Sequence, residues 1–117
     1  MQAIKVSSDG HFFETEDGEP FFYLADTAWV ITNKLRLEEA RRYFEDRAAK
    51  GFNAVQTVVF RDLFEPNAPN AYGVRPFATE ADLYAARMNP EWIKHLRAVL
   101  RLAHEAGLYL ALLPTWG

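Results

Sequence analysis

The chain has 117 residues, enough for one ordinary domain, and its 50% hydrophobic content excludes a disordered or collagen-like protein. Thirteen basic and sixteen acidic side chains give a net charge of -3, which argues against binding to nucleic acid or to anionic membranes. The absence of cysteine excludes disulfides, thiolate nucleophiles and zinc–thiolate sites. The first residues lack the pattern of a signal peptide, which predicts a cytoplasmic chain, although a longer parent protein could be exported.

The first twenty residues are predicted to form a small antiparallel hairpin. Short apolar runs alternate there with glycine turns at Gly10 and Gly18. Residues 21–25 then form an unbroken apolar run, which predicts a strand covered on both faces. Residues 28–31 could begin a short helix.

Two amphipathic helices are predicted in the rest of the chain. The first starts near Leu37 and ends at Gly51, and the second starts at Asn89 and ends at Gly107. Each is followed by an apolar segment of strand length, at 52–60 and at 108–113, which predicts two further buried strands.

The segment between the second strand and the second helix is predicted to be mostly loop. Residues 61–89 contain several prolines and asparagines and no sustained period, apart from one helical turn expected around 80–86. Loops of this length in compact domains are usually functional.

The order of the predicted elements indicates an α/β fold with parallel strands. A β-α-β-α-β unit is either half of a doubly wound sheet or three-eighths of a (β/α)₈ barrel. A dinucleotide-binding sheet needs a glycine-rich turn after its first strand, but this sequence has Asp26-Thr27-Ala28-Trp29 there. We therefore expect a partial (β/α)₈ TIM barrel, with residues 1–20 as an N-terminal hairpin and 21–117 as three strands and two crossover helices.

The binding site of such a barrel lies at the carboxyl ends of its strands. Polar and aromatic residues near the predicted strand ends, or in the long loop, are therefore candidates for substrate binding: Asp26, Trp29, Gln56, Arg61, Asn70, Tyr72 and Trp116. Aromatic rings beside a carboxylate and an amide suit a sugar, whose C–H faces pack on rings while its hydroxyls need donors and acceptors. The sequence thus indicates a carbohydrate partner.

Each candidate also has an ordinary structural explanation. Asp26 could cap a following helix, and Trp29 and Trp116 could belong to the hydrophobic core. Gln56 is polar within an apolar strand, so it needs a partner, which a neighbouring side chain or a ligand would supply. Arg75 in the long loop could reach the same face or be solvated.

Nothing in the sequence forms a catalytic triad or a metal site. His95 and His104 are expected on opposite sides of one helix, and the serines at 7 and 8 lie in a turn. We therefore expect no metal and no cofactor, and we nominate no catalytic residue.

Four segments resemble a known family: 20–29 (PFFYLADTAW), 47–56 (RAAKGFNAVQ), 69–73 (PNAYG) and 107–117, which ends in PTWG. They are similar to the N-terminal part of the catalytic domain of apiosidase-like glycoside hydrolases, formerly a domain of unknown function. The resemblance extends from about Ile4 to Gly117. One departure is Arg97, where we expect an acidic residue of the family.

The resemblance implies a (β/α)₈ barrel that hydrolyses plant cell-wall or related polysaccharides. It implies two catalytic carboxylates on later strands, outside this sequence, and it places the following residues in the pocket wall: Asp26, Trp29, Asn70, Tyr72, Gly73 and Trp116. A complete barrel takes about 250 residues. We therefore expect a fragment of a glycoside hydrolase that is inactive alone.

Two further expectations concern association. The fragment would associate with itself through exposed strand edges, or with the missing C-terminal part of the barrel. The alternative functions are a non-catalytic carbohydrate-binding module and a self-assembling half-barrel.

Overall fold

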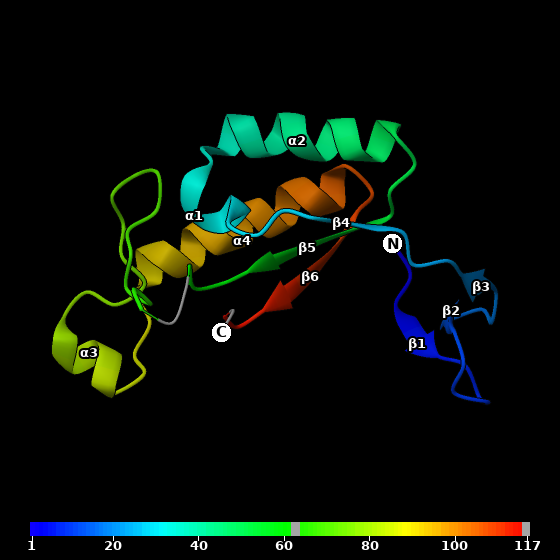
Figure 1. Ribbon diagram of the computed structural model, residues 1–117, viewed down its shortest axis with the longest axis horizontal. Coiled ribbons are helices and arrows are strands. Elements are labelled where there is room, and N and C mark those ends of the chain that lie inside the picture. Colours follow the sequence, from blue (N-terminus) through cyan, green and yellow to red (C-terminus); the bar gives the residue numbers. More distant parts are fainter. Residues whose placement is uncertain (62–63, 116–117) are drawn as a thin grey trace.

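The computed structural model describes residues 1–61 and 64–115 (Figure 1). The elements in chain order are β1 (Ile4–Val6), β2 (Phe13–Thr15), β3 (Pro20–Phe21), β4 (Ala25–Thr27), α1 (Ile31–Lys34), α2 (Leu37–Ala49), β5 (Ala54–Val58), α3 (Glu80–Tyr84), α4 (Pro90–Glu105) and β6 (Tyr109–Leu113). The alternation of strands and helices after residue 24 confirms the α/β class expected from the sequence.

The strands form two separate sheets. The first is an antiparallel meander in the order β1-β2-β3, and the second is a parallel sheet in the order β4-β5-β6. The meander lies at the amino end of the parallel strands, and α3 lies beyond their carboxyl end (Figure 1). The expected hairpin is present as β1 and β2, with Pro20–Phe21 added as a third strand.

Helices α2 and α4 pack beside each other and against the parallel sheet. Phe44 of α2 and Val99 of α4 are fully buried with Val55 of β5 in one hydrophobic cluster. Gly51 and Gly107 follow these helices with φ angles of 86° and 78°, a left-handed backbone that glycine adopts without strain. Within the described ranges no helix is long and apolar enough to cross a bilayer.

The segment between the two sheets differs from the expected buried strand at 21–25. Only Ala25 belongs to β4, and the side chain of Phe22 is 79% exposed. The side chain of Asn53 takes over part of the strand pairing here, because its Nδ2 donates to the carbonyl of Phe22 and its Oδ1 accepts from the amide of Leu24 at 3.0 Å. The carbonyl of Leu24 accepts from the backbone amides of Asn53 and Ala54 at 3.0 and 3.2 Å. The apolar run at 21–25 could not by itself reveal that the side chain of Asn53 binds this segment.

The two later strands differ in burial. β5 is central and has fully buried residues at four of its five positions, as expected. β6 was expected to be buried as well, but it is half-exposed and Leu112 is 37% exposed. The reason is that β6 pairs only with β5 in the part of the chain that the structure describes.

Candidate functional site

The register of the parallel sheet separates two faces. Side chains alternate along a strand, so Asp26, Val55 and Leu110, which lie side by side, point to the same face. Val55 and Leu110 pack in the cluster with α2 and α4, which makes this the helix face. The other face, called the open face below, carries Ala25, Thr27, Ala54, Gln56, Val58, Tyr109, Ala111 and Leu113.

Gln56 is the polar residue at the centre of the open face, between Thr27 and Ala111. Its backbone carbonyl accepts from the amide of Ala28 at 2.8 Å. Its side-chain amide has no hydrogen-bond partner among the described residues, so the expected neighbour is not found. Because Gln56 is only partly buried, water can solvate this amide, which removes the cost that a buried strand position would impose.

Trp29 follows the carboxyl end of β4 and lies beside the last two residues of β5. Its carbonyl accepts from the amide of Val58 at 3.0 Å and from the hydroxyl of Thr57 at 3.2 Å, while its side chain is 42% exposed. The core interpretation is therefore wrong for Trp29. Arg61 follows β5, and its guanidinium lies 3.7 Å from the carboxylate of Glu65. Trp116, the third-strand candidate, lies outside the described residues.

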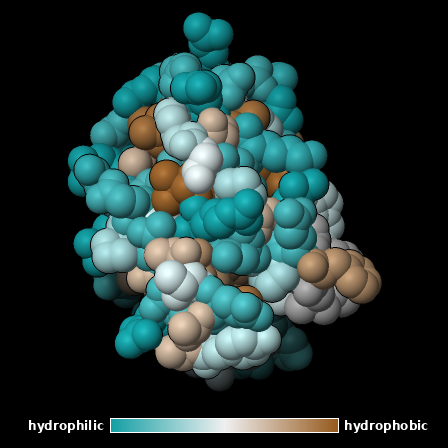
Figure 2. All heavy atoms as spheres, turned by 90° about the vertical axis from the view of Figure 1, so that its left-hand side faces the viewer, coloured by the Kyte–Doolittle hydropathy of each residue, from teal (hydrophilic) through white to brown (hydrophobic). Residues whose placement is uncertain are grey.

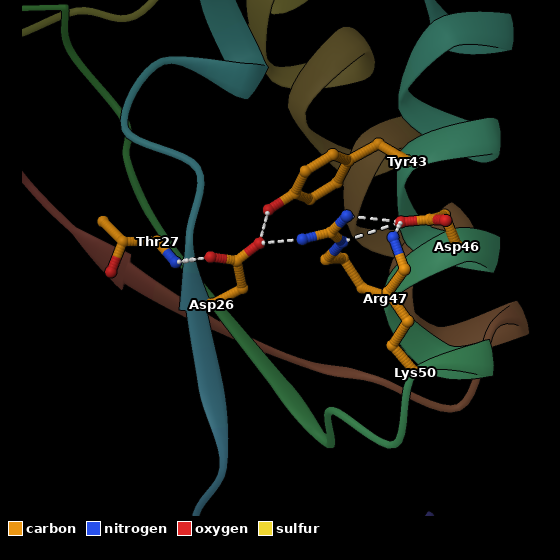
Figure 3. Close-up of polar contacts among 6 residues, drawn as sticks. All are labelled: Asp26, Thr27, Tyr43, Asp46, Arg47 and Lys50. Carbon is orange, nitrogen blue, oxygen red and sulfur yellow. Dashed lines mark hydrogen bonds and ion pairs between the residues drawn. The ribbon is translucent and has the colours of Figure 1, made fainter.

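Asp26 is on the helix face, opposite to the face of Gln56. Its carboxylate points toward Tyr43 and Arg47 of α2 (Figure 3). Its Oδ2 accepts from the Tyr43 hydroxyl at 2.7 Å and from the Arg47 guanidinium at 2.9 Å, and its Oδ1 accepts from the Thr27 amide at 2.8 Å. The helix-cap interpretation is wrong, because Asp26 lies within β4 and the residue preceding α1 is Val30. Asp26 instead ties β4 to α2.

The electrostatics of this cluster keep Asp26 ionised. The hydrogen bond from Tyr43 lowers the pKa of Asp26 most, and those from Thr27 and Arg47 lower it further, against the opposing effect of burial. Burial, followed by the contact with Asp26, raises the pKa of Tyr43, so its hydroxyl stays a donor. Arg47 also pairs with Asp46, which contacts Lys50 at 2.9 Å. The cluster is suited to holding charge rather than to transferring protons.

Asn70 and Tyr72 contact the helix layer. Asn70 is 6% exposed, and its Oδ1 accepts from the amides of Tyr72 and Val74 at 2.9 and 3.0 Å, which shapes a turn that Gly73 closes with φ of 77°. The Tyr72 hydroxyl accepts from the amide of Leu37 at 2.9 Å, at the first turn of α2. The structure therefore places these two candidates in another group from Gln56.

His95 is a buried residue that sequence reasoning did not select. Its Nε2 lies 2.9 Å from the carbonyl of Thr32, and its ring packs near Tyr72 and Trp92, with centroids 5.6 and 6.2 Å apart. The available signal was its position, three residues after Trp92 and four before Val99, on the apolar face of α4. Among the described residues no group of three His, Cys, Asp or Glu side chains is placed to hold a metal ion.

The arrangement provides binding groups without a pair of catalytic acids on the sheet. Over the described strands β4, β5 and β6, no open-face position carries Asp or Glu. Glycoside hydrolysis requires two opposed carboxylates. The end of the molecule beyond these strands is mostly hydrophilic, with separate apolar side chains between the polar ones (Figure 2).

Comparisons with known proteins agree with this geometry. Residues 7–117 match the family model described as "Apiosidase-like, catalytic domain". One similar solved structure is a glycoside hydrolase with 26% identity and a TM-score of 0.82, and another is a glycoside hydrolase family 5 crystal structure from Bacteroides vulgatus with 25% identity and a TM-score of 0.83. Each match covers 97% of this chain and 25% of the other, so this chain spans a quarter of their length. None of the curated protein sequences matches.

These likenesses confirm the expected fold class. The three parallel strands and two crossover helices correspond to part of a (β/α)₈ glycoside hydrolase barrel, in which the open face is the inner face. The helix face is then the outer side of the sheet, where α2 and α4 pack.

Proposed function

Because the chain belongs to the apiosidase-like catalytic-domain family, we propose that it is the first part of a glycoside hydrolase barrel and supplies a wall of the sugar-binding cleft. The observation that carries this proposal is the open face, whose described positions hold an unpartnered amide at Gln56 and no carboxylate. This face can bind hydroxyl groups, but it lacks the acid and base of a glycosidase.

The proposed cleft wall consists of residues at the carboxyl ends of β4 and β5. Trp29 offers an exposed ring for the apolar face of a sugar, and Gln56 offers one donor and one acceptor. Arg61 and Trp116 are proposed to extend the same wall. Asp26 contributes indirectly. Its hydrogen bonds to Tyr43 and Arg47 attach β4 to α2, and β4 contains Thr27 and leads into Trp29.

The catalytic carboxylates are proposed to come from later strands of the same barrel, so the 117-residue chain is inactive alone. Hydrolysis needs carboxyl groups about 5–5.5 Å apart for retention or about 6.5–9.5 Å apart for inversion. The proposed substrates are plant cell-wall or related polysaccharides. The proposed partner is the remaining part of the barrel, which would pair with the free edges of β4 and β6, or, in its absence, a second copy of the chain.

A non-catalytic carbohydrate-binding role is the second candidate. The exposed ring of Trp29 and the free amide of Gln56 favour it, since both serve binding without requiring a reaction. The two functions differ in whether hydrolysis appears when the missing strands are supplied.

The isolated chain tests the proposal by two measurements. We expect no release of sugar from pectic or hemicellulosic oligosaccharides, and we expect the NMR signal of the Gln56 side-chain amide to shift as these oligosaccharides are added. Gln56→Ala should abolish binding at the open face, whereas Arg42→Gln, at an exposed position of α2, should leave it unchanged. Hydrolysis by the isolated chain would contradict the proposal, as would signal shifts confined to the helix face.

A longer chain that continues into further βα units separates the two candidate functions. We expect such a chain to hydrolyse an oligosaccharide that the 117-residue chain only binds. Sedimentation of the short chain then tests association, because free strand edges should produce dimers or larger species. A monomer at all concentrations would contradict association through those edges.

A further inference from the structure

A cavity lies on the helix side of the molecule, between the first turns of α2 and α4. Its volume is about 260 Å³, and its polar lining comes from Asn70, Tyr72, Glu91, Lys94 and His95. None of these residues belongs to the open face. We call it the α2–α4 pocket.

His95 brings an unused acceptor to the α2–α4 pocket. The carbonyl of Thr32 can only accept, so the contact at 2.9 Å requires the proton to be on Nε2 and leaves Nδ1 as a bare lone pair. No described residue donates to this Nδ1. His95 is only 8% exposed, and burial lowers its pKa, which keeps the ring neutral.

Asn70 brings an unused donor to the same cavity. Both backbone amides that it binds, those of Tyr72 and Val74, donate to Oδ1, which fixes the orientation of its side-chain amide. The Nδ2 atom is buried and has no partner in the described ranges, although the residue is only 6% exposed. Buried donors of this kind are normally satisfied, so Nδ2 calls for an acceptor.

Sugar hydroxyls suit both needs, because a hydroxyl can donate to a lone pair or accept from an amide. Glu91 and Lys94 form an ion pair at 3.7 Å at the exposed rim, where a carboxylate and an ammonium can receive further hydroxyls. The cavity volume lies just under the range of about 300–1,000 Å³ typical of small-molecule sites, which suits a ligand the size of one sugar ring.

We propose that the α2–α4 pocket binds a single neutral monosaccharide unit through His95 and Asn70, as an accessory site separate from the open-face cleft. It requires no catalytic group and would operate in the 117-residue chain. A polysaccharide held there would be bound to the outer helix layer rather than at the strand ends.

The test is an NMR titration of the 117-residue chain with D-xylose and with D-galactose, with ordered water as the competing occupant. We expect a saturable shift of the His95 Nδ1 signal, accompanied by a shift of the nearby Trp92 indole N–H. Lys94→Ala and Glu91→Gln should each weaken binding about fivefold, the effect of one hydrogen bond of about 1 kcal/mol. Arg101→Ala, an exposed change on the same helix outside this pocket, should have no effect.

Three outcomes would overturn the accessory site. The first is the absence of a saturable shift with either sugar, which would assign the polar groups to water alone. The second is unchanged affinity in both Lys94→Ala and Glu91→Gln. The third is loss of the His95 shift in Gln56→Ala. The last variant separates the two proposals, because it removes binding at the open face and should leave the α2–α4 pocket intact.

Discussion

The bond between Tyr43 and Asp26 gives the sharpest test of how β4 is attached to α2. Tyr43→Phe removes one hydroxyl and keeps the ring, so the change is confined to the 2.7 Å hydrogen bond. Hydrogen bonds to charged groups contribute roughly 1.5–3 kcal/mol. Because the Asp26 side chain remains 29% exposed, water replaces part of the bond, and we expect a loss of about 1–2 kcal/mol in the free energy of unfolding. The corresponding fall in Tm is about 4–10 °C for a domain of this size.

The pH dependence of this effect follows from the lowered pKa of Asp26. A carboxyl group whose pKa is lower in the folded state stabilises the fold above its ordinary pKa of 3.8, and this contribution is lost as the pH falls through the folded value. Tyr43 is the largest cause of that lowering, so the difference between the wild type and Tyr43→Phe should be full at pH 7 and should shrink in acid.

Urea unfolding monitored by circular dichroism at neutral and at acid pH measures both quantities. The matched control is Tyr23→Phe, since the Tyr23 side chain is 37% exposed and its hydroxyl has no hydrogen bond among the described residues. This control should change stability by less than about 0.5 kcal/mol. An equal loss in the two variants, or a loss in Tyr43→Phe that is the same at both pH values, would refute the reasoning.

Three further variants test other parts of the fold. The fold should lose stability as the pH falls from about 6.5 through the lowered pKa of His95. In thermal melts at several pH values, His95→Phe should remove this pH dependence and His104→Gln should keep it. Gly51→Ala should lower the free energy of unfolding in urea by roughly 1–2 kcal/mol, because a φ of +86° is strained for alanine. Nothing lies within 4 Å of the added Cβ, so no clash adds to this cost, and Gly51→Asn should cost less. Asn53→Ala should speed proteolysis within residues 22–24, because it removes both side-chain hydrogen bonds to this segment and leaves only the backbone bonds to the carbonyl of Leu24; cleavage at the wild-type rate would contradict that role.

Much of the larger sheet could be predicted from the sequence, because each of its main elements has a one-dimensional pattern. The apolar stripe that includes Phe44, and the stripe that includes Val99, mark the faces of α2 and α4 that pack on the sheet. The continuous apolar run of β5 marks a strand buried on both sides. Periodicity and burial coincide in these elements, which explains their correct prediction.

The remaining features depend on contacts between distant residues. Asp26 binds Tyr43 and Arg47, which lie 17 and 21 positions later, and no local pattern predicts that its carboxylate faces a helix. The backbone carbonyl of Phe22 accepts from the side chain of Asn53, 31 positions away. Local sequence reasoning placed Asp26 near a strand end but could not assign the direction of its side chain, and it wrongly placed Phe22 in a buried strand.

The difference between local patterns and long-range contacts also explains which candidate site residues lie together. Trp29 follows the end of β4 and Gln56 lies in the middle of the neighbouring strand β5, beside Thr27, so the rule for parallel sheets placed them in one region. Asn70 and Tyr72 lie in a loop whose course no such rule predicts, and they joined His95 in the helix layer instead.

Across residues 1–61 and 64–115, the two sheets share no ladder of backbone hydrogen bonds. The amino-terminal part is linked to the larger sheet by the short covalent connection at 22–24, by the Asn53 side chain, and by Tyr109, whose ring meets Phe21 edge-on with centroids 5.2 Å apart and whose hydroxyl donates to the carbonyl of Gln2. With so few contacts between them, the two sheets should unfold at different temperatures. On heating, the meander β1-β2-β3 should unfold first, while the parallel sheet packed against α2 and α4 stays folded. The unfolding transition measured by calorimetry should then be broadened on its low-temperature side.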